Sequence, residues 1–378
     1  METPRLRVNA ETISVLILLA WLIPAVAARS QEPPRTGKEP KAGITVGVTS
    51  TSSVIVTPFL SDKRQDFEVT IAAKPSEVWK ALTTEEGIRS FYAPAAKIEM
   101  IPGGAYEIYY KPDAPPGERG MEGTQVLSFV PNEMLAGTGS APPQFPTVQK
   151  EKTKWVILLD DLGNGQTRFR MSLLEFGTGP EWDHAYEYFL KNNAAFPEML
   201  RKRFVDGPVD WAARGVTLPP PTRNEPVSPA AVKRLWRVDK SARFPAQVSD
   251  VWSLLTTRRG LEKWAGAYAN VQLKFGGAYE LYYNPSVAPG QRGLEGTKVL
   301  AYVPNEMLSY SWLARPEHPE VRKGPTWVVW RIVDEGKGMV RVRYTVLGLG
   351  EGPEWEAAFN DLDKRMELEL RMLQGAAK

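Results

Sequence analysis

Apolar residues recur every three or four positions near the end of the chain. This spacing places them on one stripe of a helix, so residues 355–373 are predicted to form an amphipathic helix. A matching stripe over residues 182–200 predicts a second helix of the same kind. The two stripes comprise Trp355, Phe359, Leu362, Met366, Leu370 and Leu373, and Trp182, Tyr186, Phe189, Asn193, Phe196 and Leu200.

Polar and apolar residues alternate along residues 168–174 and again along residues 340–346. A period of two predicts strands with one wet face and one covered face. Other strand-like runs are separated by short Gly- or Pro-rich turns, which indicates an antiparallel meander. Each meander follows a short strand and two small helices, the first of which begins near Ser76 or Ser249. These elements predict an α+β helix-grip fold, in which a curved antiparallel sheet wraps around one long C-terminal helix.

The same elements occur twice because the sequence repeats itself at an offset of 173 residues. Between Pro75 and Leu135, 31 of 61 residues are identical to those between Val248 and Leu308. A repeat this long indicates a tandem duplication of whole domains, not a solenoid of short units. We predict a signal peptide over residues 1–28, a disordered or weakly structured linker over 29–64, a first domain over 65–205, a Pro-rich linker over 206–234 and a second domain over 235–376.

An apolar run extends from Ile13 to Ala27 and follows Arg5 and Arg7. A basic start, an apolar stretch of this length and small residues at its end are typical of a secretory signal peptide. We expect cleavage near Ala27 and a secreted or periplasmic protein that meets the membrane only transiently, through this signal. The alternative is an uncleaved N-terminal membrane anchor. Beyond the signal, alternating residues over 44–60 are compatible with an additional hairpin.

The composition excludes several classes of site. The chain has 47 Lys and Arg and 44 Asp and Glu, mixed along its length, so its net charge of +3 predicts no nucleic-acid partner. It contains no cysteine and two histidines, which excludes thiol nucleophiles and argues against zinc clusters. His184 and His318 align with Ala357 and Phe145, so neither position carries a base in both copies. We expect no metal and no cofactor.

Four stretches of each copy resemble one known superfamily. They are the helical segment WKALTTEEGIRSFYA, the strand after the paired glycines, the strand that runs from EGT into VPNEML, and the final Trp-bearing helix. They are similar to the SRPBCC (START-like) superfamily, and most similar to its bacterial branch named after the activator of the heat-shock-protein ATPase, which is related to polyketide cyclases. The resemblance covers both copies, about three quarters of the chain. It implies an apolar cavity between each sheet and its long helix.

Aromatic residues of the predicted strands and closing helices are the expected wall of these cavities. Such a wall would bind a small hydrophobic or aromatic ligand, with tyrosine hydroxyls and one amide as its few polar contacts. The alternative is that the same rings simply fill each core. The candidates are Tyr106, Tyr109, Trp155, Phe169, Tyr186, Phe189 and Asn193 in the first domain, and Tyr279, Tyr282, Trp327, Trp330, Tyr344 and Phe359 in the second.

Asn193 is polar on an otherwise apolar stripe. A buried amide costs about 1–3 kcal/mol unless it is hydrogen-bonded, so it would need a protein partner or a ligand. The alternative is that Pro197 kinks or breaks the helix and leaves Asn193 in solvent.

Charged residues also recur in both copies. Two carboxylates in one pocket could divide acid and base roles, but their recurrence equally fits a shared structural requirement. The pairs are Glu107 with Glu280, Arg119 with Arg292, Glu122 with Glu295, and Glu181 with Glu354.

Three functions are compatible with these patterns. The leading hypothesis is an exported, non-catalytic protein that binds a small hydrophobic or aromatic ligand, because no catalytic set stands out. The second is a cyclase- or aromatase-like enzyme in the first domain, with His184, Glu107 or Tyr186 moving protons. The third is a co-chaperone-like module that binds a protein partner, which the resemblance suggests and export would disfavour.

Overall fold

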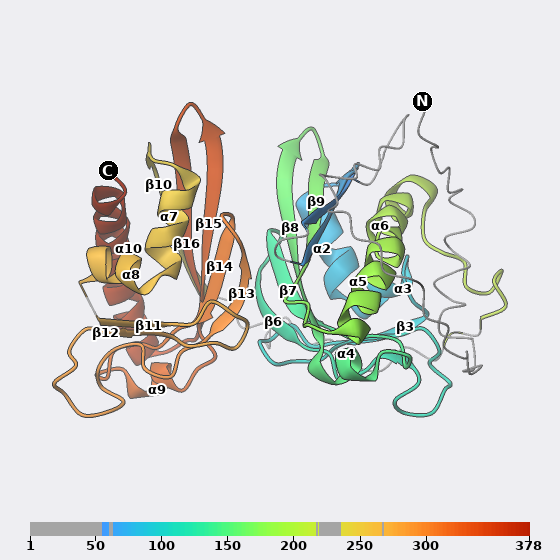
Figure 1. Ribbon diagram of the computed structural model, residues 1–378, viewed down its shortest axis with the longest axis horizontal. Coiled ribbons are helices and arrows are strands. Elements are labelled where there is room, and N and C mark those ends of the chain that lie inside the picture. The colour runs from blue at the N-terminus through green and yellow to red at the C-terminus, as the bar shows by residue number, and fades with distance from the viewer. Residues whose placement is uncertain (1–54, 60–62, 217, 219–235, 267) are drawn as a thin grey trace, which may run out of the picture. The chain divides into compact units, whose positions relative to one another are not determined.

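The computed structural model describes residues 55–59, 63–216, 218, 236–266 and 268–378. The predicted signal peptide, most of the predicted linker over 29–64 and most of the predicted Pro-rich linker lie outside these residues. The chain divides near Pro220 into two compact units, which we call the first and second domain. In each domain an antiparallel sheet packs with helices (Figure 1). Within the described ranges, no helix is both long enough and apolar enough to span a bilayer.

The elements of the first domain include the predicted short strand, two small helices, antiparallel meander and closing helix, and also others that were not predicted. They are β1 (Ile55–Phe59), β2 (Arg64–Ile71), α2 (Pro75–Thr83), α3 (Glu85–Arg89), β3 (Ala95–Ile98), β4 (Tyr106–Tyr109), β5 (Gly120–Met121), β6 (Val126–Val130), β7 (Met134–Gly139), α4 (Pro146–Glu151), β8 (Thr153–Gly163), β9 (Gln166–Leu174), α5 (Pro180–Asn192) and α6 (Ala195–Asp206). The main sheet has the order β1-β2-β9-β8-β7-β6, and a small sheet has the order β3-β4-β5. Strand β1 pairs antiparallel with β2, so the sheet begins before residue 65.

Alternate residues of β8 and β9 form the inner face of the main sheet. The register pairs Trp155 with Leu173 and Ile157 with Met171. Because side chains alternate along a strand, these four residues point to the same side.

The closing helix of the first domain is interrupted. Helix α5 ends at Asn192 and α6 begins at Ala195. Pro197 has no amide hydrogen for the carbonyl of Asn193, and its ring would clash with that carbonyl in a continuous helix. The Asn193 carbonyl instead accepts a hydrogen bond from the Phe196 amide at 3.2 Å. The prediction that Pro197 kinks or breaks this helix is confirmed.

The start of the predicted Pro-rich linker belongs to the folded first domain. Trp211 is buried, and its indole N–H donates a hydrogen bond to the carbonyl of Arg89 at 2.6 Å. The Val209 amide donates to the carbonyl of Ser90 at 2.9 Å. These contacts anchor the segment that follows α6, so the domain extends past residue 205.

The second domain repeats this arrangement. Its elements are β10 (Trp236–Pro245), α7 (Val248–Thr256), α8 (Arg258–Ala265), β11 (Tyr268–Val271), β12 (Tyr279–Tyr282), β13 (Val299–Val303), β14 (Met307–Ser311), α9 (Pro319–Arg322), β15 (Trp327–Gly336), β16 (Met339–Leu349) and α10 (Pro353–Ala376). The main sheet has the order β10-β16-β15-β14-β13, and β11 pairs with β12.

Helix α10 runs without a break because Leu370 occupies the position that Pro197 takes in the first domain. Its apolar stripe is buried in the domain core, at Leu362, Met366, Leu370 and Leu373. The helix predicted from the three-to-four spacing is therefore confirmed. Both domains are α+β helix-grip folds, and the tandem duplication predicted from the sequence is confirmed.

Candidate functional site

A cavity of about 120 Å³ lies in the first domain, between the main sheet and the interrupted closing helix. Residues of β8 and β9 form one wall, and residues of α5 and α6 form the other. The sheet side comprises Tyr106, Ile108, Gly139, Thr153, Trp155, Ile157, Met171 and Leu173; the helix side comprises Tyr188, Phe189, Asn192, Asn193 and Phe196; and Tyr92, Tyr110, Met121, Ser140 and Pro142 complete it.

Four candidate residues of the first domain lie at this cavity: Tyr106, Trp155, Phe189 and Asn193. The hydroxyl of Tyr106 donates a hydrogen bond to the carbonyl of Leu82 at 2.8 Å, so its ring and not its polar group faces the cavity. The Trp155 indole likewise donates to a backbone carbonyl, that of Thr138, at 3.0 Å. Their contribution to the cavity is therefore mainly apolar.

The other three candidates lie elsewhere. The hydroxyl of Tyr109 donates to Glu107 at 2.5 Å, and that of Tyr186 donates to the Arg64 carbonyl at 3.3 Å. Phe169 is fully buried on the same face of β9 as Met171, and its ring meets that of Phe196 at 6.2 Å, but it is not among the residues that line the cavity. The structure therefore does not place these three rings at the cavity, and the two hydroxyls are hydrogen-bonded to groups elsewhere in the domain.

Three tyrosines reach the cavity without having been singled out in the sequence. The hydroxyl of Tyr110 donates to that of Tyr92 at 2.7 Å, and the two rings meet edge to face at 5.5 Å. Tyr188 lies on the helix side. In the second copy, Tyr92 and Tyr188 align with Ala265 and Asp361. Because these aromatic side chains are absent from the second copy, a comparison of the two copies could have indicated that they matter in the first domain alone.

Asn193 sits at the break between α5 and α6 and is half-buried at the cavity wall. Its side-chain amide makes no hydrogen bond to any residue that the structure describes. Asn193 is therefore neither fully buried nor fully exposed to solvent. The amide can both donate and accept a hydrogen bond.

The cavity is electrically neutral, since the residues that line it include no Asp, Glu, Lys, Arg or His. Burial raises the pKa of Tyr92, Tyr110 and Tyr188. All three hydroxyls therefore keep their protons at neutral pH. They can act as hydrogen-bond donors and acceptors but not as anionic bases.

In alkaline solution, the Tyr188→Phe protein should lose less stability than the wild type. Burial raises the pKa of Tyr188 to about 12, whereas an unfolded tyrosine titrates near about pH 10. The resulting stabilisation is complete below about pH 10 and is lost as the pH rises toward 12, because only the unfolded chain releases the proton. Urea unfolding at about pH 9 and 11 should show a smaller loss for Tyr188→Phe than for the wild type. Equal losses would contradict the burial of this hydroxyl.

Three of the six aromatic candidates of the second domain, Tyr279, Trp330 and Tyr344, fill its core. Trp330 and Tyr344 stack at 3.9 Å, and Tyr279 stacks on Tyr310 at 4.0 Å. All four rings are buried. The alternative that rings fill the core therefore describes this group better than a cavity wall.

The remaining candidates of the second domain lie outside this group of stacked rings. Trp327 lies an odd number of residues from Trp330 on β15, so it faces the opposite side of the sheet. The hydroxyl of Tyr282 donates to Glu280 at 2.9 Å on a strand edge. Phe359 is only partly buried against the core.

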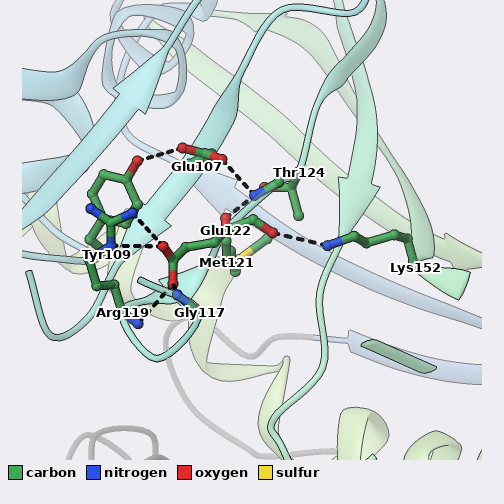
Figure 2. Close-up of polar contacts among 9 residues, drawn as sticks. Glu107, Tyr109, Gly117, Arg119, Met121, Glu122, Thr124 and Lys152 are labelled. Atoms are coloured by element: carbon green, nitrogen blue, oxygen red, sulfur yellow. Dashed lines mark hydrogen bonds and ion pairs between the residues drawn. The ribbon is translucent and has the colours of Figure 1, made fainter. Parts of the chain in front are cut away.

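Figure 2 shows the polar network around the recurring Arg119 and Glu122 of the first domain. Glu122 accepts hydrogen bonds from the amides of Gly117 and Arg119 at 2.7 and 3.0 Å, and from the Arg119 guanidinium at 2.7 Å. Lys152 donates to the Glu122 carbonyl at 2.9 Å. Partial burial raises the pKa of Glu122, but the hydrogen bonds from Arg119 and Gly117 outweigh it and lower that pKa overall. This carboxylate is a structural anion that holds the loop.

Glu107 has a similar role in the same network (Figure 2). It accepts hydrogen bonds from the Tyr109 hydroxyl and from the Gly123 amide, both at 2.5 Å. In the second domain, Glu280 accepts from Tyr282 at 2.9 Å and from the amide of Gly296 at 2.7 Å. The recurrence of this glutamate is explained by the loop that it fixes.

The last recurring pair caps short helices. Glu181 accepts hydrogen bonds from two amides at the start of α4, at 2.6 and 3.1 Å. Glu354 does the same for α9, at 2.7 and 3.2 Å. These contacts fit the structural interpretation of the recurring glutamates.

The histidines do not form a shared site. His184 is exposed on α5. His318 is buried in the second domain, with its Nε2 atom 3.4 Å from a carboxylate oxygen of Asp361. Among the described residues, no group of three His, Asp or Glu side chains could hold a metal ion.

Several solved structures are similar to the chain at low identity. Protein MLL2253 from Mesorhizobium loti is 18% identical with a TM-score of 0.31, over 37% of this chain and 96% of that one. The di-domain ARO/CYC BexL from the BE-7585A biosynthetic pathway is 11% identical with a TM-score of 0.30, over 83% and 98%. The Aha1 dimer from Colwellia psychrerythraea is 16% identical with a TM-score of 0.27, over 38% and 96%.

No curated protein shows significant similarity to the chain. A family model does match, however, and it matches once in each copy of the repeat. The family is described as Activator of Hsp90 ATPase homolog 1-like protein, and the matched residues are 72–202 and 245–372. Because these two matches span more than half of the sequence, the chain belongs to this family, as its resemblance to the SRPBCC superfamily indicated.

Proposed function

We propose that the first domain binds a small, uncharged, mainly aromatic or aliphatic molecule in the cavity between its sheet and α5. The observation that carries the proposal is a cavity lined by aromatic and aliphatic side chains, with hydroxyl and amide groups but no ionised group. Ligand pockets are commonly apolar with a few polar groups that fix orientation. Here Asn193 and the Tyr92–Tyr110 hydroxyl pair supply those groups.

The cavity favours a ligand of about one ring. Its volume of about 120 Å³ is close to that of an engineered apolar cavity of about 150 Å³ that binds benzene. Pockets for drug-sized ligands run to about 300–1,000 Å³. A larger ligand would require the helix side, already interrupted at Asn193, to move.

The arrangement supports binding without catalysis. In the cyclase hypothesis His184, Glu107 or Tyr186 would transfer protons, and none of the three lines the cavity. His184 is exposed, and the polar groups of the other two are bound to neighbouring residues. The tyrosines that do line it remain protonated because burial raises their pKa.

Two matched probes test the proposal. The full chain should bind 4-methylphenol, and 4-methylbenzoate should bind at least roughly tenfold more weakly. Burying a carboxylate without a cationic partner costs several kcal/mol, and about 1.4 kcal/mol is a factor of ten in affinity. Ligand-detected NMR, in which the two probes compete for the protein, measures both affinities.

Equal binding of the two probes, or binding of neither, would overturn the proposed function. Multiple turnover of an aromatic or polyketide-like substrate by the purified chain would support the cyclase hypothesis instead.

A further inference from the structure

The two domains carry side chains of very different size at equivalent positions of their sheets. Strand β7 of the first domain carries Gly137 and Gly139, where β14 and the residue after it carry Tyr310 and Trp312. The registers agree, since Gly137 pairs with Trp155 and Tyr310 pairs with Val328 at the same offset. The difference is therefore one of side-chain volume at equivalent sites.

In the first domain, the indole of Trp155 lies over both glycines. A Cβ atom built on Gly137 would meet Cζ2 of that ring at 2.4 Å, and one on Gly139 would meet its Cδ1 at 3.4 Å. The neighbouring inward residues are Ile157 and Met171. Of the five positions Gly137, Gly139, Trp155, Ile157 and Met171, only Trp155 carries an aromatic ring, so the cavity stays open.

In the second domain, the equivalent five positions carry four aromatic side chains. Trp330 and Tyr344 replace Ile157 and Met171 and stack on each other at 3.9 Å. The indole of Trp330 donates to the hydroxyl of Tyr310 at 3.2 Å. Tyr310 in turn stacks on Tyr279, so these rings take up the space that is open in the first domain.

The surface above this filled core differs as well. A groove of about 930 Å³ there is lined by Asp361, Arg365 and Glu369, at the positions of Tyr188, Asn192 and Phe196. Arg365 donates to Glu369 at 2.7 Å and lies over the ring of Tyr283 at 4.4 Å. An uncharged apolar ligand would remove water from this ion pair, which disfavours its binding.

We infer that the chain binds its apolar ligand at one site, in the first domain alone, and that Gly137, Gly139, Ile157 and Met171 keep that site open. The inference rests on the proposed function and adds which copy acts and which residues decide it. In the second domain, aromatic rings fill the inner part of the equivalent cavity, and what remains of it is the charged groove.

Methionine methyl NMR of the full chain distinguishes the two domains. Met121 and Met171 line the first-domain cavity, and Met366 lies in the core of the second domain at the position of Asn193. Titration with 4-methylphenol should shift the methyl signals of Met121 and Met171 saturably and leave that of Met366 in place. Ile157→Trp, which installs the second domain's residue, should weaken binding at least roughly tenfold while Met171 still reports.

Each outcome decides something different. Saturable shifts at Met366, or full binding by a folded Ile157→Trp protein, would overturn the one-site inference while leaving the proposed function intact. No shift at any methionine would overturn both. The wild-type titration decides the question even if Ile157→Trp does not fold.

Discussion

Replacing Trp330 with alanine should lower the free energy of unfolding of the second domain by about 3–5 kcal/mol, the cost usual for removing a buried large aromatic side chain. Its side chain is 1% exposed, stacks on Tyr344 at 3.9 Å and meets Trp264 edge to face at 6.2 Å. Its loss would also remove the hydrogen bond to Tyr310 and leave a void among rings that cannot easily collapse. A loss of this size corresponds to a fall in the unfolding temperature of roughly 10–17 °C.

The matched control is Ile157→Ala, at the equivalent position of the first domain. Ile157 is also buried, but it already borders a cavity, so its loss should fall at the lower end of the range of about 2–5 kcal/mol. Calorimetry of the full chain would resolve the two transitions. A loss below about 1 kcal/mol for Trp330→Ala would contradict the tightly filled core that the stacked rings describe.

The closing helices and the break in the first of them could be predicted from the sequence because their signals are local. The stripe from Trp355 to Leu373 follows helix α10, and Pro197 marks the break before α6. Each of these signals depends on spacing or on one residue's backbone chemistry, and neither requires knowledge of a distant neighbour.

The candidate site was harder to predict because a cavity depends on volumes supplied by several elements at once. Gly139 and Met171 are unremarkable in their own segments and matter only where β7, β8 and β9 pair. Comparing the two copies at the offset of 173 residues exposes them, since glycine stands opposite tryptophan and methionine opposite tyrosine.

The alternation of side chains along a strand explains why Trp327 and Tyr109 do not lie where the sequence predicted them. Trp327 and Trp330 are three residues apart on β15, as Tyr106 and Tyr109 are on β4, so the members of each pair face opposite sides. Only Tyr106 of the first-domain pair reaches the cavity. When a cavity wall is predicted from aromatic residues, only those on the inward-facing alternate positions of each strand should be counted.

The second large effect is expected from Gly137→Ala, which should weaken the binding of 4-methylphenol at least roughly tenfold. The added methyl group would lie 2.4 Å from Cζ2 of Trp155 and 2.9 Å from the backbone oxygen of Gln125. The backbone oxygen is held within the sheet, so the indole must move. The indole lines the cavity, and a shift away from β7 would carry it into the space that the ligand needs.

The same substitution should cost about 1–3 kcal/mol of stability, because extra volume in a packed region forces strained positions. Gly375→Ala is the control, since a methyl group there meets no atom within 4 Å; it should leave binding unchanged and, because Gly375 lies in helix α10, should not destabilise the fold. Titration followed by the methyl signal of Met171 measures the affinity, and urea unfolding measures the stability. If Gly137→Ala binds the probe as tightly as the wild type, the packing of Trp155 on this glycine does not control the site.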